Sequence, residues 1–387
     1  MRPTACKRIE QVQDPVIPII GAWIRDNPGT LSLAQGVVSY SPPDVVAETL
    51  GSIDPSDPAI CRYGPAAGQD ALLEIITDKL LKENDIDCVG RQVFCTAGSN
   101  MAFLTVLLAI ANVGDEVLLV RPYYFNHQMA IELAGCHCKY ADSTPDFQLD
   151  IDAIANGLTD RVRAVVTVSP NNPSGAVYPR EALSEVNRLC GERGIYHIHD
   201  EAYEYFTFDD REHFSPASLP ESLEHTVSLF SISKSFAMAG WRFGYAVVPE
   251  HLTAAVQKVQ DTNLISVSGV TQQIASAVIP LGQAWCKQRI AALSTARDMV
   301  LAARDHLSGG ATICQPQGAF YALLTLPARR HDLDVVQQLI ERFKVAVLPG
   351  STFGINSGCV LRVSFGGLPL ERLEAALARL TAGIREL

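Results

Sequence analysis

The chain has 387 residues, of which 48% are apolar and 19% are charged. These values are ordinary for a globular protein, argue against a disordered chain, and allow one large domain with a smaller one beside it. The formal net charge is -11, so the chain lacks the basic surface by which proteins bind nucleic acid or anionic membranes. We therefore expect a small-molecule partner, with no nucleic acid and no membrane.

The longest apolar stretch is too short to span a membrane. It covers residues 101–113, is broken at Thr105 and Asn112, and falls below the roughly 20 residues that a span requires. We predict a buried helix there. The N-terminus starts with basic residues but has no apolar core, and Glu10 and Asp14 are not typical of a transit peptide. A cytoplasmic location is expected.

The ten cysteines show no disulfide pattern, because only Cys136 and Cys138 have a paired spacing. These two flank His137 and could form half of a metal site, but a zinc site needs a second pair of ligands at suitable spacing. The segment from His137 to Asp142 instead has the composition of a strand, following a helix that closes at Gly135. We therefore expect free thiols and no metal here.

Seven short apolar or β-branched runs follow one another from Arg91 onward, and most are separated by segments with helical periodicity. The runs are VFCTAG, DEVLLVRP, CHCKYAD, VRAVVTVSP, IYHIHDEAY, TVSLFSIS and FGYAVVP. This pattern predicts an α/β fold, with a mostly parallel seven-stranded sheet covered by helices on both faces. In such sheets the functional groups gather where strands end.

The pattern of predicted helices and strands changes near Gly282. A long helical stretch, several short strands and a final helix follow, which predicts a smaller α+β domain. The residues before Pro43 are rich in Pro and Gly and contain only a short helix-like piece. We expect a large domain over residues 46–282, a small domain over 283–387, and an N-terminal segment, 1–45, that packs with the small domain.

One lysine lies just past a predicted strand, in the segment SISKSFAMAGWRFG. Lys234 stands among the hydroxyl residues Ser231 and Ser233, with Arg242 eight positions further on. An amine can form an imine with an aldehyde, and hydroxyls together with a fixed cation can hold a phosphate. These residues describe an aldehyde cofactor that carries a phosphate. A lysine after a strand is usually a solvated surface charge, so the surrounding pattern decides between the two interpretations.

That pattern resembles the lysine signature of the class I and II aminotransferases, which belong to the fold-type I pyridoxal phosphate enzymes. The signature reads S-x-S-K-x-x-x-x-x-G-x-R-x-G, and this chain matches every fixed position. The resemblance implies that Lys234 holds pyridoxal 5'-phosphate as an imine. It also implies that Ser231, Ser233 and Arg242 bind the phosphate, and that residues 46–282 form the cofactor-binding domain.

Asp200 ends a predicted strand in the segment HIHDEAYEYF. A carboxylate there suits the ring nitrogen of the cofactor, because the ion pair keeps the ring protonated and electron-withdrawing. The segment resembles the family's D-E-x-Y, whose tyrosine, here Tyr203, hydrogen-bonds the cofactor's phenolic oxygen. An aspartate that caps the following turn is the alternative. His197 and His199 suggest a rival metal site, but strand alternation puts Asp200 on the other face.

The segment SPNNPSG resembles the family's N-P-x-N-P-T-G, although Ser169 and Ser174 replace the usual Asn and Thr. The resemblance implies that Asn172 donates to the same phenolic oxygen as Tyr203 and helps to keep it ionised. It also places Asn172 beside the substrate. The alternative is a plain turn rich in Asn, Pro and Gly.

The segment TAGSNMAF joins a predicted strand to a predicted helix. We expect the backbone amides of Gly98, Ser99 and Asn100 to be free at the helix start and to seat a phosphate. This resembles the family's small-residue phosphate loop. An ordinary N-cap formed by Ser99 is the alternative and is compatible with a phosphate site.

Two further side chains are assigned through the resemblance. Tyr124, the second aromatic after Pro122, corresponds to the residue that stacks on the pyridine ring, with an ordinary core or surface tyrosine as the alternative. Arg362 lies inside the predicted strand CVLRVSFG, where an unpaired guanidinium is costly and a planar fork matches a carboxylate. The family's arginine there binds the substrate α-carboxylate. A structural salt bridge is the alternative.

Two N-terminal segments complete the resemblance. LSLAQGVVSYSPP is similar to the family's substrate-closing segment, in which the amide of Gly36 approaches the substrate carboxylate, although Val38 stands where proline is common. CRYGPAAGQDAL has Tyr63 and Gly68 at the spacing of a segment whose tyrosine reaches the phosphate of the neighbouring subunit. The resemblance thus implies a homodimer with shared active sites.

The activity implied is transfer of an amino group between an L-amino acid and a 2-oxo acid by a ping-pong mechanism. Lys234 would act as imine partner and proton carrier, with Asp200 and Tyr203 as the other catalytic residues. Three alternatives are open. The first is other chemistry on this cofactor, as in a C-S β-lyase or a cyclopropane amino acid synthase; the second is a non-catalytic sensor; the third is a metal-dependent hydrolase built on His197 and His199.

The sequence leaves the side-chain specificity open, because no second arginine can be assigned to the distal part of a substrate pocket. Aspartate, aromatic, methionine-like and kynurenine-like donors all fit the motifs. The segment LAQGVVSYSPP is more similar to the broad-specificity, kynurenine-aminotransferase-like branch than to the classical aspartate enzymes.

Overall fold

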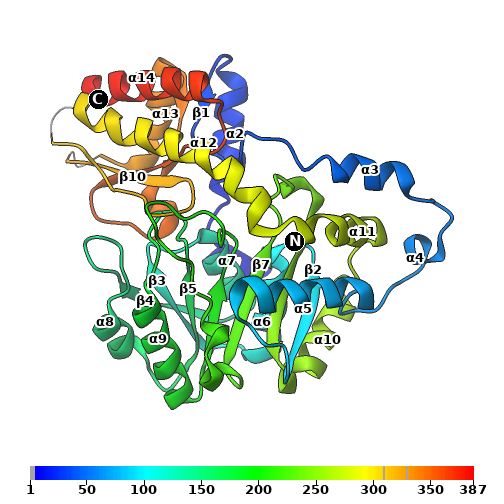
Figure 1. The fold of residues 1–387 in the computed structure, drawn as a ribbon. Helices are drawn as coiled ribbons and strands as arrows, with labels where there is room; N and C mark the ends of the chain where they lie inside the picture. The colour runs from blue at the N-terminus through cyan, green and yellow to red at the C-terminus, as the bar shows by residue number, and fades with distance from the viewer. Residues whose placement is uncertain (1–4, 308–309, 328–329) are drawn as a thin grey trace, which may run out of the picture.

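The computed structural model describes residues 5–307, 310–327 and 330–387. A large sheet with its helices forms the lower part of the molecule in Figure 1, and a smaller sheet with helices lies above it. The fold thus has the predicted α/β architecture.

The large sheet has seven strands in the order β2-β8-β7-β6-β5-β3-β4. The pairs from β7 through β6, β5 and β3 to β4 are parallel, whereas β8 runs antiparallel to both β7 and β2. The strands are β2 (Arg91–Thr96), β3 (Glu116–Arg121), β4 (His137–Asp142), β5 (Val162–Val168), β6 (Tyr196–Asp200), β7 (Thr226–Ser231) and β8 (Gly244–Pro249). The predicted mostly parallel sheet is confirmed, and each of the seven runs contains one strand.

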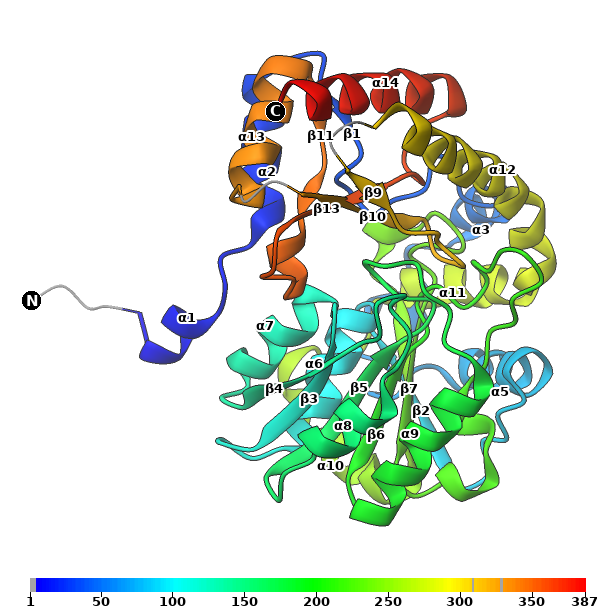
Figure 2. The same ribbon diagram turned by 90° about the vertical axis from the view of Figure 1, so that its left-hand side faces the viewer.

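Both faces of this sheet are buried, because alternate residues of each strand enter different apolar clusters. In β3, Val117 and Leu119 pack with Phe103 of α6, whereas Leu118 and Val120 pack in another cluster with α8 and α9. Figure 2 shows helices on both sides of the sheet. The helices of this part of the chain are α5 (Asp70–Asn84), α6 (Ser99–Ile110), α7 (Phe125–Leu133), α8 (Ile151–Gly157), α9 (Arg180–Arg193), α10 (Thr253–Asn263) and α11 (Gly269–Val278).

A second, antiparallel sheet has the order β12-β13-β10-β9 and belongs to the C-terminal part of the chain. Its neighbours α12 and α14 contact each other, as do α13 and α14. The elements are α12 (Gly282–Ala302), β9 (Thr312–Ile313), β10 (Tyr321–Leu326), α13 (Asp332–Phe343), β11 (Val345–Ala346), β12 (Leu348–Pro349), β13 (Cys359–Ser364) and α14 (Leu370–Glu386). This is the mixture of helices and strands that the sequence pattern after Gly282 predicts.

The N-terminal segment holds more helix than the sequence predicted. Its elements are α1 (Lys7–Gln11), α2 (Val16–Asp26) and β1 (Leu31–Ser32), and it is followed by α3 (Val45–Ser52) and α4 (Pro58–Cys61). The expectation of one short piece, based on the Pro and Gly content of this segment, was wrong because the position of a proline in a helix decides its effect. Pro18 lies in the first turn of α2, where its missing N–H costs no helical hydrogen bond. β1 pairs with β11, and α2 contacts α13.

The predicted buried helix over residues 101–113 was also too long. α6 ends at Ile110, and Val113 is 82% exposed in the turn that follows. The carboxylate of Asp115 accepts a hydrogen bond from the Asn112 amide at 2.8 Å, and Gly114 has a φ of 90°. Such a turn stops the helix although the apolar composition continues. None of the helices in the described ranges combines the length and the apolarity that crossing a bilayer requires.

The direction of the strands places the functional segments at one edge. The parallel strands β5, β6 and β7 end next to one another, at Val168, Asp200 and Ser231. β2 runs in the same direction as β7, so the loop after Thr96 opens at that edge too. The cavity described below lies where these strands end, as expected for sheets of this type.

Candidate active site

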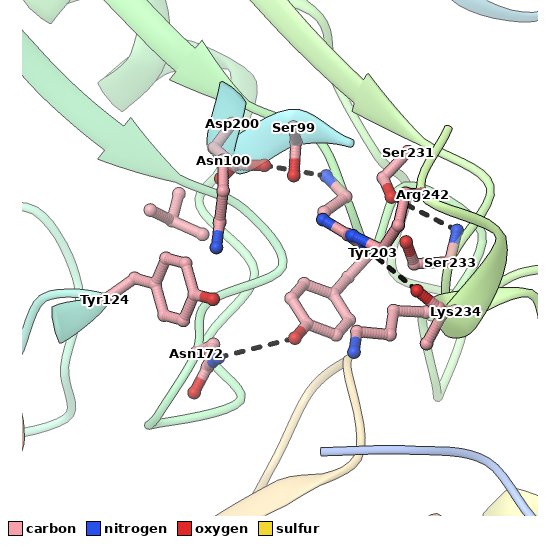
Figure 3. Close-up of a pocket in the computed structure, with 13 residues that line it drawn as sticks. Ser99, Asn100, Tyr124, Asn172, Asp200, Tyr203, Ser231, Ser233, Lys234 and Arg242 are labelled. Atoms are coloured by element: carbon pink, nitrogen blue, oxygen red, sulfur yellow. Dashed lines mark hydrogen bonds between the residues drawn. The ribbon is translucent and has the colours of Figure 1, made fainter. Parts of the chain in front are cut away.

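A cavity of roughly 510 Å³, its open mouth included, lies at this edge of the sheet. Figure 3 shows its lining, and every residue labelled there was singled out from the sequence. The lining residues are Ser99, Asn100, Tyr124, Val168, Asn172, Asp200, Ala202, Tyr203, Ser231, Ser233, Lys234, Ala239 and Arg242. They come from the ends of five different strands or from the segments that follow them, so the sheet topology brings them together.

Lys234 follows β7 and lies in the wall of this cavity (Figure 3). Its Nζ donates a hydrogen bond to the carbonyl oxygen of Gly36 at 2.5 Å. Burial, followed by the positive charges of Arg362 and Arg242, lowers the pKa of Lys234 to about 8. An amine with this pKa is partly unprotonated near neutral pH, which is the form that attacks a carbonyl.

Asp200 ends β6 and is buried. Its Oδ1 accepts a hydrogen bond from the Ala202 amide at 3.0 Å, and its Oδ2 lies 3.1 Å from Nε2 of His127. His127 is buried on α7, with its ring 5.2 Å from that of Tyr124 and perpendicular to it. No sequence motif indicates a role for His127, although it lies one helical turn after Tyr124 and faces the same way.

One corner of the cavity combines three hydroxyls with a guanidinium. The hydroxyl residues are Ser99, Ser231 and Ser233, and Arg242 donates to the carbonyl oxygens of Ala239 at 2.9 Å and Ala97 at 3.2 Å. Within the described ranges no carboxylate forms an ion pair with Arg242. This donor set suits an anion.

The first turn of α6 adds backbone donors to this corner. The N–H groups of Ser99 and Asn100 lie where a helix has no internal acceptor for them. The expectation of a free Gly98 amide was wrong, because that amide donates to the Thr96 carbonyl at 2.8 Å. Gly98 instead provides space: it has a φ of 86°, and a Cβ there would lie 2.4 Å from Nη2 of Arg242.

Arg362 lies on β13, and its buried side chain contacts Asn172 of the cavity lining. The residue is 2% exposed, with Nη1 donating to Oδ1 of Asn172 at 2.9 Å and Nη2 to the Ala34 carbonyl at 2.5 Å. Its Nε is buried and has no acceptor among the described residues, and no carboxylate there pairs with the guanidinium. The salt-bridge alternative therefore finds no support, and burial lowers the pKa of Arg362.

Asn172 connects Arg362 to the tyrosines of the cavity. Its Nδ2 donates to the Tyr203 hydroxyl at 3.3 Å, and that hydroxyl lies 2.7 Å from the hydroxyl of Tyr321. Tyr321 begins β10 and was not selected from the sequence. A possible signal was the aromatic pair Phe320–Tyr321 at the start of a predicted strand, but nothing in the sequence indicates what it contacts.

The comparison with protein families decides what kind of site this is. The family model for aminotransferase class I and II matches residues 28–380. An aromatic aminotransferase of Arabidopsis thaliana is 34% identical over 382 residues, covering 96% of this chain and 94% of that protein. The chain belongs to the class I and II aminotransferases.

Solved structures agree with this placement. Aspartate aminotransferase from Thermus thermophilus, solved with maleate, has a TM-score of 0.89 at 28% identity, covering 99% of this chain and all of the other. An aromatic aminotransferase from Pyrococcus horikoshii has a TM-score of 0.86 at 29% identity, covering 95% and 99%. This aminotransferase therefore uses pyridoxal phosphate and acts on amino acids and 2-oxo acids. Its relatives' activities do not favour β-elimination.

The residues of the cavity fit that cofactor. The hydroxyls and Arg242 form an anion corner, Asp200 supplies a buried carboxylate, and Lys234 has a depressed pKa. The buried Nε of Arg362 also has no acceptor within the described ranges, which is what a site for a carboxylate ligand requires.

Other residues considered in the sequence lie elsewhere in the aminotransferase. Tyr63 is 83% exposed after α4 and does not line the cavity of the single chain. His197 and His199 share one face of β6, as predicted, and both bond the hydroxyl of Thr167, at 2.8 and 2.7 Å. Burial lowers the pKa of both histidines. No cluster of metal-ligating side chains occurs in the described ranges, and all ten cysteines are free.

Proposed function

We propose that the cavity holds pyridoxal phosphate with Lys234 as its imine partner. The observation that carries the proposal is the half-buried Lys234, whose amine has a pKa lowered to about 8, in one cavity with Asp200 and Arg242. When bound, the cofactor supplies an electron sink for a carbanion at the substrate α-carbon. Ser99, Asn100, Ser231, Ser233 and Arg242, with Gly98 leaving room for the arginine, anchor the phosphate.

Four side chains would tune the ring of the bound cofactor. Asp200 keeps the ring nitrogen protonated, and the neighbouring His127 helps to fix the carboxylate. Tyr124 stacks on the ring. Asn172 and Tyr203 hydrogen-bond the phenolic oxygen, a role supported by the contact that already joins them.

The mechanism requires one proton to move twice. When it is not bound to the cofactor, the Lys234 amine, with its depressed pKa, would accept the proton from the substrate α-carbon on Nζ and then deliver it to the former aldehyde carbon of the cofactor. The Gly36 carbonyl, 2.5 Å from Nζ, fixes the resting position of this amine. The contact involves the Gly36 carbonyl, and approach of the Gly36 amide to a substrate carboxylate stays a prediction.

The substrate α-carboxylate is bound by Arg362. Its Nε lacks a protein acceptor within the described ranges, and Asn172 holds Nη1 from the side. A guanidinium that is already fixed can bind a carboxylate with little loss of side-chain entropy.

We infer that aromatic L-amino acids are better donors than aspartate. The relatives' names include an aromatic aminotransferase, a probable aspartate/prephenate aminotransferase and several aspartate aminotransferases, so the inference rests on the lining of the cavity. The cations of the cavity lining are Lys234 and Arg242, so within the described part of the chain a second substrate carboxylate finds no cation of its own. The segment that contacts Lys234 continues with the half-buried apolar residues Val37 and Val38.

A donor-by-acceptor panel tests this inference by oxo-acid formation. We expect kcat/KM for phenylalanine and tyrosine to exceed that for aspartate by roughly 10-fold or more, because burying an unpaired charge is costly. Alanine serves as the small apolar control. Aspartate turnover equal to that of phenylalanine would contradict the inference.

We further propose a homodimer in which Tyr63 completes the partner's phosphate site. The ring is 83% exposed in the single chain, and its hydroxyl is free to reach another subunit. Tyr63→Phe should weaken pyridoxal phosphate binding to the apoenzyme by roughly 10-fold, the value of one hydrogen bond to a charged group. The dissociation constant is measured by absorbance titration.

Tyr196→Phe is the matched control, because its hydroxyl bonds His251 at 3.1 Å, away from the cavity. Sedimentation should give a dimer for the parent and both variants. A monomer that binds the cofactor fully, or an unchanged constant for Tyr63→Phe, would contradict the shared site. The cytoplasmic location and the domain boundaries at residues 45 and 282 stay predictions.

A further inference from the structure

Tyr321 is held rigidly beside Tyr203. It is 1% exposed and pairs with Ser364 across the antiparallel sheet. Its ring lies perpendicular to that of Tyr203, with centroids 5.5 Å apart, and the Arg362 guanidinium stands 4.5 Å from the ring centroid. Aromatic and cation–π contacts of this kind fix the ring and therefore its hydroxyl.

Gly36 leaves the space that this hydroxyl occupies. A Cβ at position 36 would lie 2.2 Å from the Tyr321 hydroxyl oxygen, closer than any side chain can approach. The carbonyl of the same glycine accepts the hydrogen bond from Lys234. Tyr321 is therefore packed against the backbone that positions the catalytic lysine.

The protons in this cluster can be assigned by counting donors. Asn172 donates to the Tyr203 oxygen at 3.3 Å, and the hydroxyls of Tyr203 and Tyr321 are 2.7 Å apart. Burial raises the pKa of both phenols, that of Tyr321 to about 12, so each carries one proton at neutral pH. If Tyr203 donates to a ligand in the cavity, the bond between the two tyrosines requires Tyr321 to be the donor.

We propose that Tyr321 is a positioning residue that acts through Tyr203: its hydroxyl donates to the Tyr203 oxygen and thereby directs the Tyr203 proton to the phenolic oxygen of the cofactor. The inference rests on the function proposed above. Tyr321 is then a second residue, behind Tyr203, that controls the negative charge on the phenolic oxygen of the cofactor.

The direction of the effect follows from hydrogen-bond cooperativity. A hydroxyl that accepts a hydrogen bond becomes a stronger donor, so Tyr321 strengthens the bond from Tyr203. A stronger donor withdraws negative charge from the phenolic oxygen, and that charge is what holds a proton on the neighbouring imine nitrogen. Loss of the Tyr321 hydroxyl should therefore raise the pH at which the lysine-bound cofactor loses this proton.

The test is a pH titration of the visible absorption of the substrate-free holoenzyme. Tyr321→Phe removes one oxygen atom and should raise the midpoint by roughly 0.3 to 1 pH unit, the size expected for one neutral hydrogen bond. Tyr203→Phe should raise it by at least as much. Because Tyr321 acts through Tyr203, the double variant should have the midpoint of Tyr203→Phe alone.

Tyr178→Phe is the matched control, since it also removes a buried phenol oxygen, one that accepts from Asn171 at 3.2 Å. Its midpoint should equal that of the parent, and thermal unfolding of each apoenzyme should show that the fold is kept. An unmoved midpoint in Tyr321→Phe, or additive shifts in the double variant, overturns the proposal. A raised KM for the amino acid with an unmoved midpoint also overturns it, and shows that Tyr321 contacts substrate directly.

The same titration separates this inference from the function on which it rests. If the parent protein shows no pH-dependent visible absorption with pyridoxal phosphate, the assignment of Lys234 fails. If the parent titrates and Tyr321→Phe follows it unchanged, only the role of Tyr321 fails.

Discussion

Replacing Lys234 with alanine should abolish transamination together with the visible absorption of the bound cofactor. The variant loses the amine that forms the imine and the base that carries the α-proton. Proton transfer by a positioned group alone contributes about 10² to 10⁴ in rate, so kcat should fall by at least about 10³-fold. The measurements are the absorption spectrum after reconstitution with pyridoxal phosphate and the rate of oxo-acid formation.

Lys258→Ala provides the control, because this side chain is exposed on α10 and away from the cavity. It should keep both the spectrum and the rate. Thermal unfolding should show that the Lys234 variant remains folded, since the substitution removes one side-chain hydrogen bond, from Nζ to the Gly36 carbonyl. A Lys234→Ala enzyme that keeps its absorption and its activity would contradict the assignment.

The sequence predicted the parts of the site that depend on local order. Side chains at or just after the ends of neighbouring parallel strands lie at one edge of the sheet, so the sequence alone placed Asp200, at the end of β6, close to Lys234, which follows β7. The same reasoning located Asn172 and the start of α6 at Ser99. These residues do line one cavity.

The sequence could not predict the contacts that depend on how distant segments pack. Tyr321 meets Tyr203 across 118 positions of the chain, and Lys234 meets Gly36 across 198. No local sequence pattern indicates which distant residues will contact each other in this way. His127 was missed for a different reason: one turn of α7 brings it near Asp200, but a buried histidine has no signature beyond that spacing.

Local errors arose where the composition of a segment was considered without the positions of its residues. Pro18 disfavours a helix only after the first turn, so α2 forms from Val16 despite it. Apolar composition favoured a helix as far as Val113, but the turn at Gly114 ends it earlier. Likewise the Gly98 amide was counted as free although a tight turn uses it internally.

The second large effect is expected at the substrate carboxylate. Arg362→Lys keeps the positive charge but loses the planar fork, the Nε donor and the contact of Nη1 with Asn172. A hydrogen bond to a charged group is worth about 1.5 to 3 kcal/mol, so losing one or two should lower kcat/KM by roughly 10² to 10⁴-fold. The loss should appear for every amino donor and every oxo-acid acceptor, since all share the α-carboxylate.

Cofactor binding distinguishes this variant from Lys234→Ala. Arg362→Lys should keep the visible absorption, because Lys234, Asp200 and the anion corner at Arg242 are unchanged. The matched control is Arg297→Lys, which alters a buried arginine paired with Asp209 at 2.5 Å on α12, outside the cavity. Its kcat/KM should stay close to that of the parent. Equal losses in the two variants would mean that Arg362 acts through stability, whereas a loss confined to Arg362→Lys assigns the substrate carboxylate to this guanidinium.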